Sequence, residues 1–257
     1  MPEYSNIFDS HAHYDDVAFD FDREELLAAL FEQDVCGIVN AASNEESSKF
    51  SIELAQRYPH LWAAVGIHPQ EVADIKDGYI ERLAKLASHP KVVAIGEIGL
   101  DFHYDIPRQL QLPVLEAQLQ LACQLNLPVI IHDREAHEPI LKLLKAYRPK
   151  GVVHCFSGSA EMAKEITGLG MYIGLGGAVT FKNAVRPLQV AEQIPLDRLL
   201  LETDAPYMAP VPYRGKRCDS SHIRFTAAKI AEIRNIPETE VLSAARQNAY
   251  DLFSIHL

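Results

Sequence analysis

The stretch Ile7-Phe8-Asp9-Ser10-His11-Ala12-His13 begins with apolar residues, ends with two histidines, and is the first of eight short apolar stretches. Such stretches are typical of strands buried on both faces of a parallel sheet. The predicted strands cover residues 7–13, 36–41, 61–66, 92–97, 128–132, 151–154, 171–175 and 199–202. Amphipathic patterns that predict helices cover residues 22–33, 44–57, 77–88, 107–125, 134–147, 159–169, 182–193, 220–234 and 237–253. Eight strand–helix units predict an α/β fold, a closed (β/α)8 or TIM barrel.

The length of the chain fits one barrel of this kind. It has 257 residues, 48% of them hydrophobic, and such barrels take roughly 250 residues. We therefore expect a single domain over residues 1–257. An open, doubly wound sheet is the alternative that the strand pattern alone leaves open. Residues 203–221 are rich in proline and glycine and are predicted to form a loop over the barrel mouth.

Composition narrows the setting in which the protein works. The sequence contains no apolar run of about 18 residues, and its start lacks the basic and apolar regions of a secretory signal. The four cysteines, Cys36, Cys123, Cys155 and Cys218, are widely spaced and predict reduced thiols in a cytoplasmic protein. We expect no membrane contact and a monomer. A net charge of −11 argues against unspecific attraction to a polyanion.

Polar side chains collect where the predicted strands end, which is where barrel enzymes carry their catalytic groups. Residues two apart on a strand share a face, so Asp9, His11 and His13 are expected to point the same way. The other strand ends carry Glu97, His132, His154 and Asp204. Each of these residues alone is explained by a hydrogen bond or a turn. Six of them at the same end of five strands are better explained by metal ligation, because adjacent buried imidazoles are costly without a partner.

Imidazole and carboxylate ligands suit divalent cations such as Zn²⁺, Mn²⁺ or, less well, Mg²⁺. His11, His13, Glu97, His132, His154 and Asp204 would hold two such cations, with Glu97 as the bridge. Two cations roughly 3.5–4 Å apart lower the pKa of a water and clamp both oxygens of an in-line displacement. A nearby carboxylate can take the proton of that water, and Asp204 is the best candidate for this base. The residues therefore predict a hydrolase.

The motifs, in this order, closely resemble those of the TatD-related metal-dependent hydrolases, a branch of the amidohydrolase-like barrels. The matching segments are residues 9–13 (DSHAH), 66–69 (GIHP), 96–101 (GEIGLD), 128–136 (PVIIHDREA), 154–158 (HCFSG), 202–207 (ETDAPY) and 212–217 (PYRGKR). They cover essentially the whole chain. A single Asp-x-His-x-His motif is weak evidence, but the complete set is specific.

This resemblance implies the division of ligands between the cations. His11, His13, Glu97 and Asp204 would hold one, and Glu97, His132 and His154 the other. It also implies metal-dependent hydrolysis of DNA, as a 3′-to-5′ exonuclease that prefers single strands, so the expected partner is a DNA 3′ end.

The chain departs from the family pattern on the substrate side. Many relatives have His-Pro-His where this sequence has His68-Pro69-Gln70, and Asn-Glu-Pro where it has Cys218-Asp219-Ser220. Two other activities at the same metal site therefore stay open, namely hydrolysis of small esters, amides or lactones and deacylation of mischarged tRNA. A non-enzymatic protein with a structural metal is a third reading, disfavoured because all six ligands are present.

Basic and aromatic residues at the predicted mouth offer contacts for a nucleic acid. The candidates for phosphate contacts are His68, Arg134, Lys182, Arg214, Lys216 and Arg217. Arginine in particular suits phosphate oxygens. The aromatic candidates for stacking on bases are Phe102, Tyr104, Phe156, Tyr207 and Tyr213. This local cluster without a basic stripe predicts contact with a chain end rather than with a long duplex.

Overall fold

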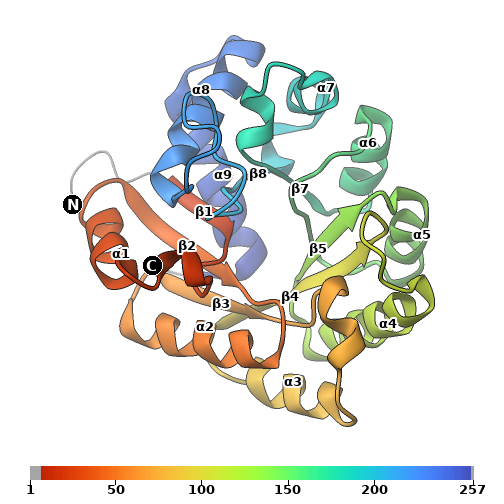
Figure 1. Cartoon of the computed structure of the whole chain (residues 1–257). Coiled ribbons are helices and arrows are strands. Elements are labelled where there is room, and N and C mark those ends of the chain that lie inside the picture. The colour runs from red at the N-terminus through yellow and green to blue at the C-terminus, as the bar shows by residue number, and fades with distance from the viewer. Residues whose placement is uncertain (1–6, 256–257) are drawn as a thin grey trace.

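The computed structural model describes residues 7–255, and eight parallel strands form its single sheet in the order β1 to β8. The strands are β1 (Ile7–Ala12), β2 (Val35–Ala41), β3 (Leu61–Val65), β4 (Val92–Asp101), β5 (Val129–Arg134), β6 (Gly151–Val153), β7 (Tyr172–Leu175) and β8 (Leu199–Leu201). Figure 1 looks along the barrel, with the helices arranged around the strands. The fold is the predicted (β/α)8 barrel.

The helices are α1 (Arg23–Glu32), α2 (Glu45–Arg57), α3 (Tyr79–Ala87), α4 (Arg108–Leu125), α5 (His137–Tyr147), α6 (Ala160–Gly168), α7 (Val185–Gln193), α8 (Ile223–Arg234) and α9 (Glu238–Phe253). Short 3₁₀ turns are η1 (Val17–Phe19), η2 (Pro69–Asp74), η3 (Gly177–Thr180), η4 (Leu196–Arg198) and η5 (Ser220–His222). Within residues 7–255, no helix is both long and apolar enough to cross a membrane.

Local sequence signals fix several helix ends. The Asn44 side chain accepts hydrogen bonds at the start of α2, and Ser47 completes a capping box. Ser159 caps α6 by accepting from the Met162 amide. Helices α4 and α8 end where Asn126 and Asn235 adopt a left-handed backbone, which asparagine tolerates better than most residues. These caps hold the helices in register with the strands that they connect.

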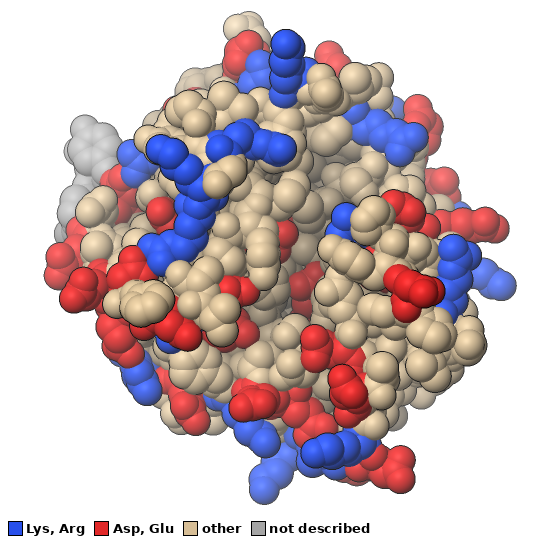
Figure 2. Space-filling view, in the orientation of Figure 1, with Lys and Arg blue, Asp and Glu red and all other residues tan. Residues whose placement is uncertain are grey.

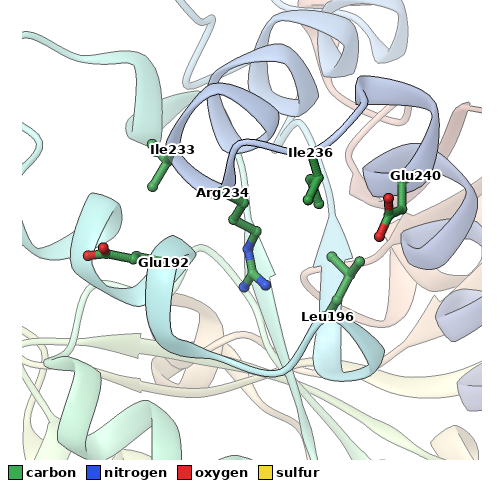
Figure 3. A pocket seen from close by; sticks show the side chains of 6 residues that line it. All are labelled: Glu192, Leu196, Ile233, Arg234, Ile236 and Glu240. Carbon is green, nitrogen blue, oxygen red and sulfur yellow. The ribbon is translucent and has the colours of Figure 1, made fainter.

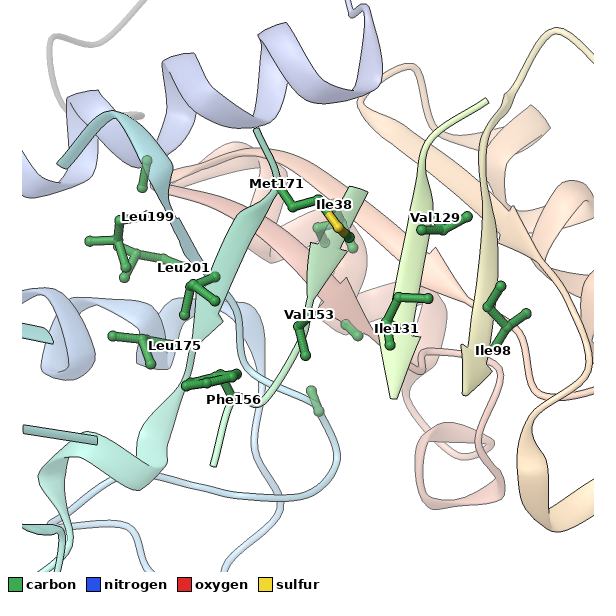
Figure 4. Close-up of a cluster of buried hydrophobic side chains, with 14 of the residues drawn as sticks. Ile38, Ile98, Val129, Ile131, Val153, Phe156, Met171, Leu175, Leu199 and Leu201 are labelled. Atoms are coloured by element: carbon green, nitrogen blue, oxygen red, sulfur yellow. The ribbon is translucent and has the colours of Figure 1, made fainter. Parts of the chain in front are cut away.

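Two buried layers hold the barrel together. The outer layer packs one face of each strand against the helices, and Figure 4 shows part of it, with Ile38, Val129, Ile131, Leu199 and Leu201 among the labelled side chains. The inner layer contains the alternate residues, among them Phe8, Ile130, Val152 and Leu200, together with Leu252 and Phe253 of α9. Because side chains alternate along a strand, the inner face of β5 continues from Ile130 to His132. The inner layer therefore leads directly up to the polar strand ends.

The barrel closes between β8 and β1 through the segments that carry predicted ligands. Ala12 and Ala205 form an isolated bridge. The His13 amide donates to the Ala205 carbonyl at 2.7 Å, and the Asp204 amide donates to the His11 carbonyl at 3.0 Å. These backbone bonds fix His11, His13 and Asp204 relative to one another before any side-chain contact is considered.

Two irregular strands explain where the fold departs from expectation. In β1, Asp9 pairs with Ile38 and Ala12 with Asn40, so β1 holds one residue more than β2 over this span. Such a bulge re-aims the following side chains. Strict alternation predicts that Asp9 shares a face with His11 and His13. Because of the bulge, that prediction is wrong, and Asp9 points to the other side of the strand. Its carboxylate instead accepts hydrogen bonds from the hydroxyls of Thr203 and Ser220, at 2.6 and 2.7 Å.

A second irregularity lies in β4 between Ile95 and Ile98, which pair with Val129 and Ile131. Here too one extra residue is inserted, and it places Glu97 on the inner face. The strand then runs on to Asp101, four residues beyond the predicted end at residue 97. Similarly, β5 continues to Arg134, and α5 begins at His137 rather than at residue 134.

Candidate metal centre

The structure brings all six predicted ligands together, with the Glu97 carboxylate at their centre. Glu97 Oε1 lies 2.7 Å from His154 Nε2 and 2.8 Å from His132 Nδ1. Glu97 Oε2 lies 3.3 Å from His11 Nε2 and 3.4 Å from His13 Nε2. One carboxylate therefore faces two pairs of imidazoles, each pair with its own oxygen. This is the arrangement expected of a bridging ligand.

Asp204 completes the group around His11 and His13. Its Oδ1 atom lies 3.6 Å from His11 Nε2 and 3.3 Å from His13 Nε2, and its side chain is 19% exposed. The backbone of Asp204 has a φ of 59°, a left-handed conformation that is uncommon outside glycine, asparagine and aspartate. The left-handed turn at the end of β8 aims the carboxylate at the cluster and leaves part of it open to the mouth.

Hydrogen bonds at the far side of two rings fix which nitrogen faces the cluster. His13 Nδ1 lies 2.7 Å from the Ala41 carbonyl oxygen, which can only accept, so Nδ1 carries the proton. In the neutral ring, Nε2 then offers a lone pair. His132 Nε2 lies 3.1 Å from the Asp101 carboxylate, so this nitrogen donates, and in the neutral ring Nδ1 then carries the lone pair on the side of Glu97. Both tautomers suit metal ligation.

The donor set fits divalent cations. Three overlapping groups of three residues bring one ligand atom each within 4.8 Å of the others, namely His11–His13–Asp204, His11–Glu97–His154 and His68–Glu97–His132. His11 Nε2 and His13 Nε2 face each other at 3.0 Å. Two neutral imidazole nitrogens with opposed lone pairs repel unless a proton or a cation lies between them. Borderline and hard cations prefer these nitrogen and carboxylate ligands.

His68 also reaches the cluster, although we had placed it among the substrate contacts. Its Nε2 lies 3.5 Å from Glu97 Oε1, and its ring lies edge-on to His132 at 4.5 Å. Its Nδ1, however, accepts a hydrogen bond from the Gln70 amide. The neutral ring must therefore carry its proton on Nε2, which makes that atom a donor rather than a lone pair. The geometry favours a role for His68 as a donor to an anion.

Sequence reasoning missed two carboxylates behind the histidines. Asp101 is fully buried and accepts from His132 Nε2; burial raises the pKa of Asp101, but the hydrogen bonds from His132 and Gln70 outweigh this and lower it. Glu202 is also buried; its Oε1 accepts from the Cys155 amide and lies 3.7 Å from His154 Nδ1. A Cβ at Gly174 would overlap with Oε2 of Glu202, so this glycine makes room for the carboxylate. Asp101 lies four residues beyond Glu97 on the same strand, and Glu202 lies two residues before Asp204; these short spacings were the signal that could have found them.

We expect Asp101→Ala to weaken metal binding by about 10- to 100-fold, the usual cost of losing a group that orients a ligand histidine. The variant leaves His132 Nε2 without its acceptor, so the ring loses its fixed tautomer. Competition with a coloured chelator measures the change. The Asp101→Asn variant retains an acceptor oxygen and should recover part of the affinity. The matched control is Asp105→Ala, which removes an exposed carboxylate in the loop that follows β4. Unchanged affinity in Asp101→Ala would contradict this role.

Metal binding should release protons. Burial disfavours the charged ring of His13, but the hydrogen bond and charge of Asp204 and the charge of Glu97 outweigh this cost and raise the pKa of His13 to about 9. Burial likewise opposes the charge on His154, yet the Glu97 carboxylate raises the pKa of His154 well above its usual value. At pH 7.5 the metal-free protein should therefore hold protons on these rings, which a cation must displace.

Because the cation competes with these protons, its affinity for the cluster depends on pH. Affinity for the cation should rise with pH up to about 9, where His13 loses its proton without help. Titration calorimetry with Zn²⁺ at pH 7.5, in two buffers of different ionisation enthalpy, measures the protons released. An identical binding heat in both buffers would show that the rings are already neutral.

The predicted phosphate contacts other than His68 follow the strands at the mouth of the barrel, and they differ in whether an ion pair already holds the side chain. Arg217 donates to both carboxylate oxygens of Asp22, at 2.7 and 2.6 Å, and to the Ala18 carbonyl. It therefore ties the loop after β8 to the loop after β1. Among residues 7–255, no ion pair with a carboxylate engages the other rim cations, Arg134, Lys182, Arg214 and Lys216.

Figure 2 shows basic side chains gathered over the loop between β8 and α8, on one side of the mouth. Acidic side chains border the opposite side, over α2 and α3. The net charge of −11 is therefore unevenly distributed around the mouth, and a polyanion meets its most favourable field beside β8.

Of the five aromatic candidates, two remain available to a ligand. Phe156 is buried, and Phe102 and Tyr213 are partly buried and pack against the hydrophobic core. Tyr104 and Tyr207 are 48% and 55% exposed.

A separate hollow lies among α7, η4, α8 and α9 (Figure 3). Its lining residues are Glu192, Leu196, Ile233, Arg234, Ile236 and Glu240. The Arg234 guanidinium donates to the carbonyls of Ala191 and Ile194, both at 2.6 Å. Because η4 directly precedes β8, this hollow lies at the N-terminal ends of the strands, whereas the metal-ligand cluster lies at their C-terminal ends. Arg234, the basic residue among those that line it, already donates to carbonyls at the end of α7. The hollow is therefore separate from the metal-ligand cluster and takes no part in its chemistry.

A (β/α)8 barrel with imidazoles and carboxylates grouped at its strand ends defines a metal-dependent hydrolase of the barrel type. The family model described as TatD related DNase matches residues 8–254. The chain therefore belongs to the TatD-related family of metal-dependent hydrolases.

Individual relatives agree over the full length. A Bacillus subtilis protein described as the uncharacterized metal-dependent hydrolase YabD is 40% identical, over 97% of this chain and all of the relative. A Citrobacter rodentium protein named 3′-5′ ssDNA/RNA exonuclease TatD is 34% identical, over 98% of this chain and 99% of the relative. The crystal structure of YjjV, a TatD homologue from Escherichia coli K12, is 35% identical and superposes with a TM-score of 0.92, covering 98% of this chain and 99% of YjjV.

Proposed function

We propose that this protein is a 3′-to-5′ exonuclease that hydrolyses phosphodiester bonds at the ends of single-stranded DNA with two divalent cations. The observation that carries the proposal is the Glu97 carboxylate, whose two oxygens face two separate pairs of histidines. The name of the Citrobacter relative supports the substrate class. The rim cations beside β8 supply charge of the sign that a phosphodiester chain requires.

In this proposal, His11, His13, Glu97 and Asp204 hold one cation, and Glu97, His132 and His154 hold the other. Zn²⁺, Mn²⁺ and Mg²⁺ are the candidates for these ligands. Bound cations would lower the pKa of a water and offset the negative charge that develops on the phosphate. Asp101 accepts from His132 and so orients that ring, and the Glu202 carboxylate lies 3.7 Å from His154 Nδ1, on the far side of the other ring.

The chain itself supplies the proton acceptor and a hydrogen-bond donor. Asp204 directs Oδ1 toward His11 and His13, while Oδ2 forms no hydrogen bond within residues 7–255. This second oxygen is free to accept the proton of the attacking water. The water oxygen forms a new bond to phosphorus while the bond between phosphorus and the 3′ oxygen of the remaining strand breaks, and that oxygen leaves with the strand and takes up a proton from solvent. His68, with its proton on Nε2, donates to a phosphate oxygen.

The charge pattern around the mouth favours a chain end over a long duplex. Arg214, Lys216 and Lys182 lie on the loops after β8 and β7. Acidic side chains border the opposite side (Figure 2). A duplex lying across the whole face would meet this acidic border. A single strand can instead leave the cluster over the basic side alone.

The test is digestion of single-stranded DNA labelled at its 5′ end, with the purified protein loaded with Mn²⁺ or Zn²⁺. We expect shortening from the 3′ end, one nucleotide at a time, that stops in excess chelator and returns when metal is restored. A 3′-blocked strand should be resistant. Turnover of carboxylic esters without any DNA shortening would overturn the proposal in favour of small-molecule hydrolysis.

A further inference from the structure

Two exposed tyrosines lie on opposite sides of the metal-ligand cluster. Tyr207 follows β8 and Tyr104 follows β4. In a sheet ordered β1 to β8, these strands are four positions apart, so the loops that follow them face each other across the mouth (Figure 1). Each of these residues is about half exposed.

Tyr207 is held beside the cluster without being buried. Its ring centroid lies 6.4 Å from that of His13. Its hydroxyl donates to Asp16 Oδ2 at 2.7 Å, and its amide donates to the Asp204 carbonyl at 2.8 Å. Both ends of the residue are therefore fixed while 55% of it stays accessible. A ring fixed in this way offers a flat surface at little cost in conformational entropy.

Tyr104 has a corresponding position on the other side. Its amide lies 3.4 Å from Oδ1 of Asp101, the carboxylate that orients His132. The Arg134 guanidinium lies over its ring at 5.0 Å and donates to its hydroxyl at 3.4 Å. Arg134 itself lies on the strand that carries His132, two residues further along. The tyrosine and the arginine thus form one composite surface next to the second pair of histidines.

We infer that Tyr207 and Tyr104 are the stacking platforms for the two bases that flank the scissile bond. Tyr207 holds the base of the strand that remains, and Tyr104, with Arg134, holds the base of the 3′-terminal nucleotide. This inference rests on the proposed nuclease function and names the base contacts of the same site. Aromatic rings bind successive bases of single strands without sequence preference, because every base has a flat π face.

The distribution of charge around the mouth indicates which tyrosine contacts the remaining strand and which contacts the terminal nucleotide. The strand that remains carries many phosphates, and the loops beside Tyr207 supply Lys182, Arg214 and Lys216, none of them paired with a carboxylate within residues 7–255. The terminal nucleotide carries few charges, and the side of Tyr104 supplies Arg134, next to acidic Asp105 and Glu135. A long polyanion is therefore best accommodated over Tyr207.

The experiment compares single strands of twelve thymidines that carry one abasic residue, either at the 3′ terminus or at the next position. Shortening of the 5′-labelled strand by metal-loaded protein gives kcat/KM, and fluorescence anisotropy in chelator gives binding without turnover. We expect Tyr104→Ala to lose about tenfold in kcat/KM on the normal strand, in the range of one stacked base, and nothing further when the terminal base is missing. Tyr207→Ala should likewise lose about tenfold in kcat/KM on the normal strand, and nothing further when the penultimate base is missing.

Control variants separate stacking from structure. Tyr104→Phe and Tyr207→Phe keep the rings and should keep most of the activity, although Tyr207→Phe loses its bond to Asp16. Tyr147→Ala, on the outer helix α5, should respond to abasic residues as the wild type does. Thermal melting checks that each variant is folded.

The outcomes separate this inference from the function on which it rests. Tyrosine variants that remain as sensitive to the missing bases as the wild type, or that exchange the two positions, would overturn the inference while leaving the nuclease intact. Binding that depends on both rings without any shortening of the strand would overturn the proposed function and support the platforms. A wild-type protein that neither binds nor shortens the strand would overturn both.

Discussion

Replacing Glu97 with glutamine is expected to abolish hydrolysis and to remove bound metal from both sites at once. Glutamine has the same shape but no charge, and its amide nitrogen would take the place of one oxygen. In the protein, the two oxygens of Glu97 lie within 3.4 Å of ring nitrogens of His11, His13, His132 and His154. Losing a group that merely orients a ligand costs about 10- to 100-fold in metal affinity or activity, so losing the shared ligand should cost more than about 100-fold.

Metal content by elemental analysis and kcat/KM on single-stranded DNA measure this loss. Glu165→Gln, which removes an exposed carboxylate on α6, serves as the matched control and should leave both quantities unchanged. If Glu97→Gln lost one metal and kept the other, the two sites would be independent, and the bridging role would be wrong. The same variant with wild-type activity would rule out the proposed site altogether.

The barrel could be predicted from sequence because two different periodicities alternate along the chain. Short apolar stretches such as 36–41 have the length of buried strands and are too short for most helices, and the amphipathic stretches between them have the period of a helix. Since all strands of a parallel barrel end at the same edge, the residues that follow them had to meet. The grouping of His132, His154 and Asp204 follows from that topology.

The orientation of individual side chains could not be predicted in the same way, because alternation fails where a strand gains a residue. The bulge in β1 turns Asp9 away from His11, and the one in β4 brings Glu97 to the inner face. In β4, Gly96 is a local signal of such an irregularity, whereas no residue of β1 marks its bulge. A bulge is set by the pairing of two strands, and therefore by residues far apart in the chain.

Contacts between loops are the other feature that sequence patterns do not predict, because the two partners can lie far apart in the chain. Arg217 is among the predicted phosphate contacts, but Asp22, 195 positions away, accepts two of its hydrogen bonds. Its place among substrate contacts remains a prediction that this ion pair weakens. The buried partners Asp101 and Glu202 were within reach, since they lie on the same strands or strand ends as predicted ligands. The sequence does not distinguish a carboxylate that orients a ligand from any other carboxylate, so their role is not predicted from it.

Replacing Asp204 with asparagine should lower kcat by about 10²- to 10⁴-fold, the usual contribution of a positioned general base. Asparagine tolerates the left-handed backbone that Asp204 adopts, with a φ of 59°, so the amide bond to the His11 carbonyl and the barrel closure should survive. The amide side chain cannot take a proton from water. Digestion of 5′-labelled single strands measures kcat and KM separately, and a loss confined to kcat is expected of a group that acts in the transition state.

Metal content decides which of the two roles of Asp204 causes the loss. An asparagine variant that keeps both cations but loses kcat has lost the proton acceptor, whereas one that loses the cation at His11 and His13 has lost a ligand. Asp197→Asn, an exposed aspartate of η4 at the opposite end of the barrel, controls for the loss of one negative charge. Normal release of nucleotides by Asp204→Asn would show that another group accepts the proton. Glu97 would be a poor substitute, because its two oxygens already face four imidazoles, so the acceptor would then have to be sought outside the cluster.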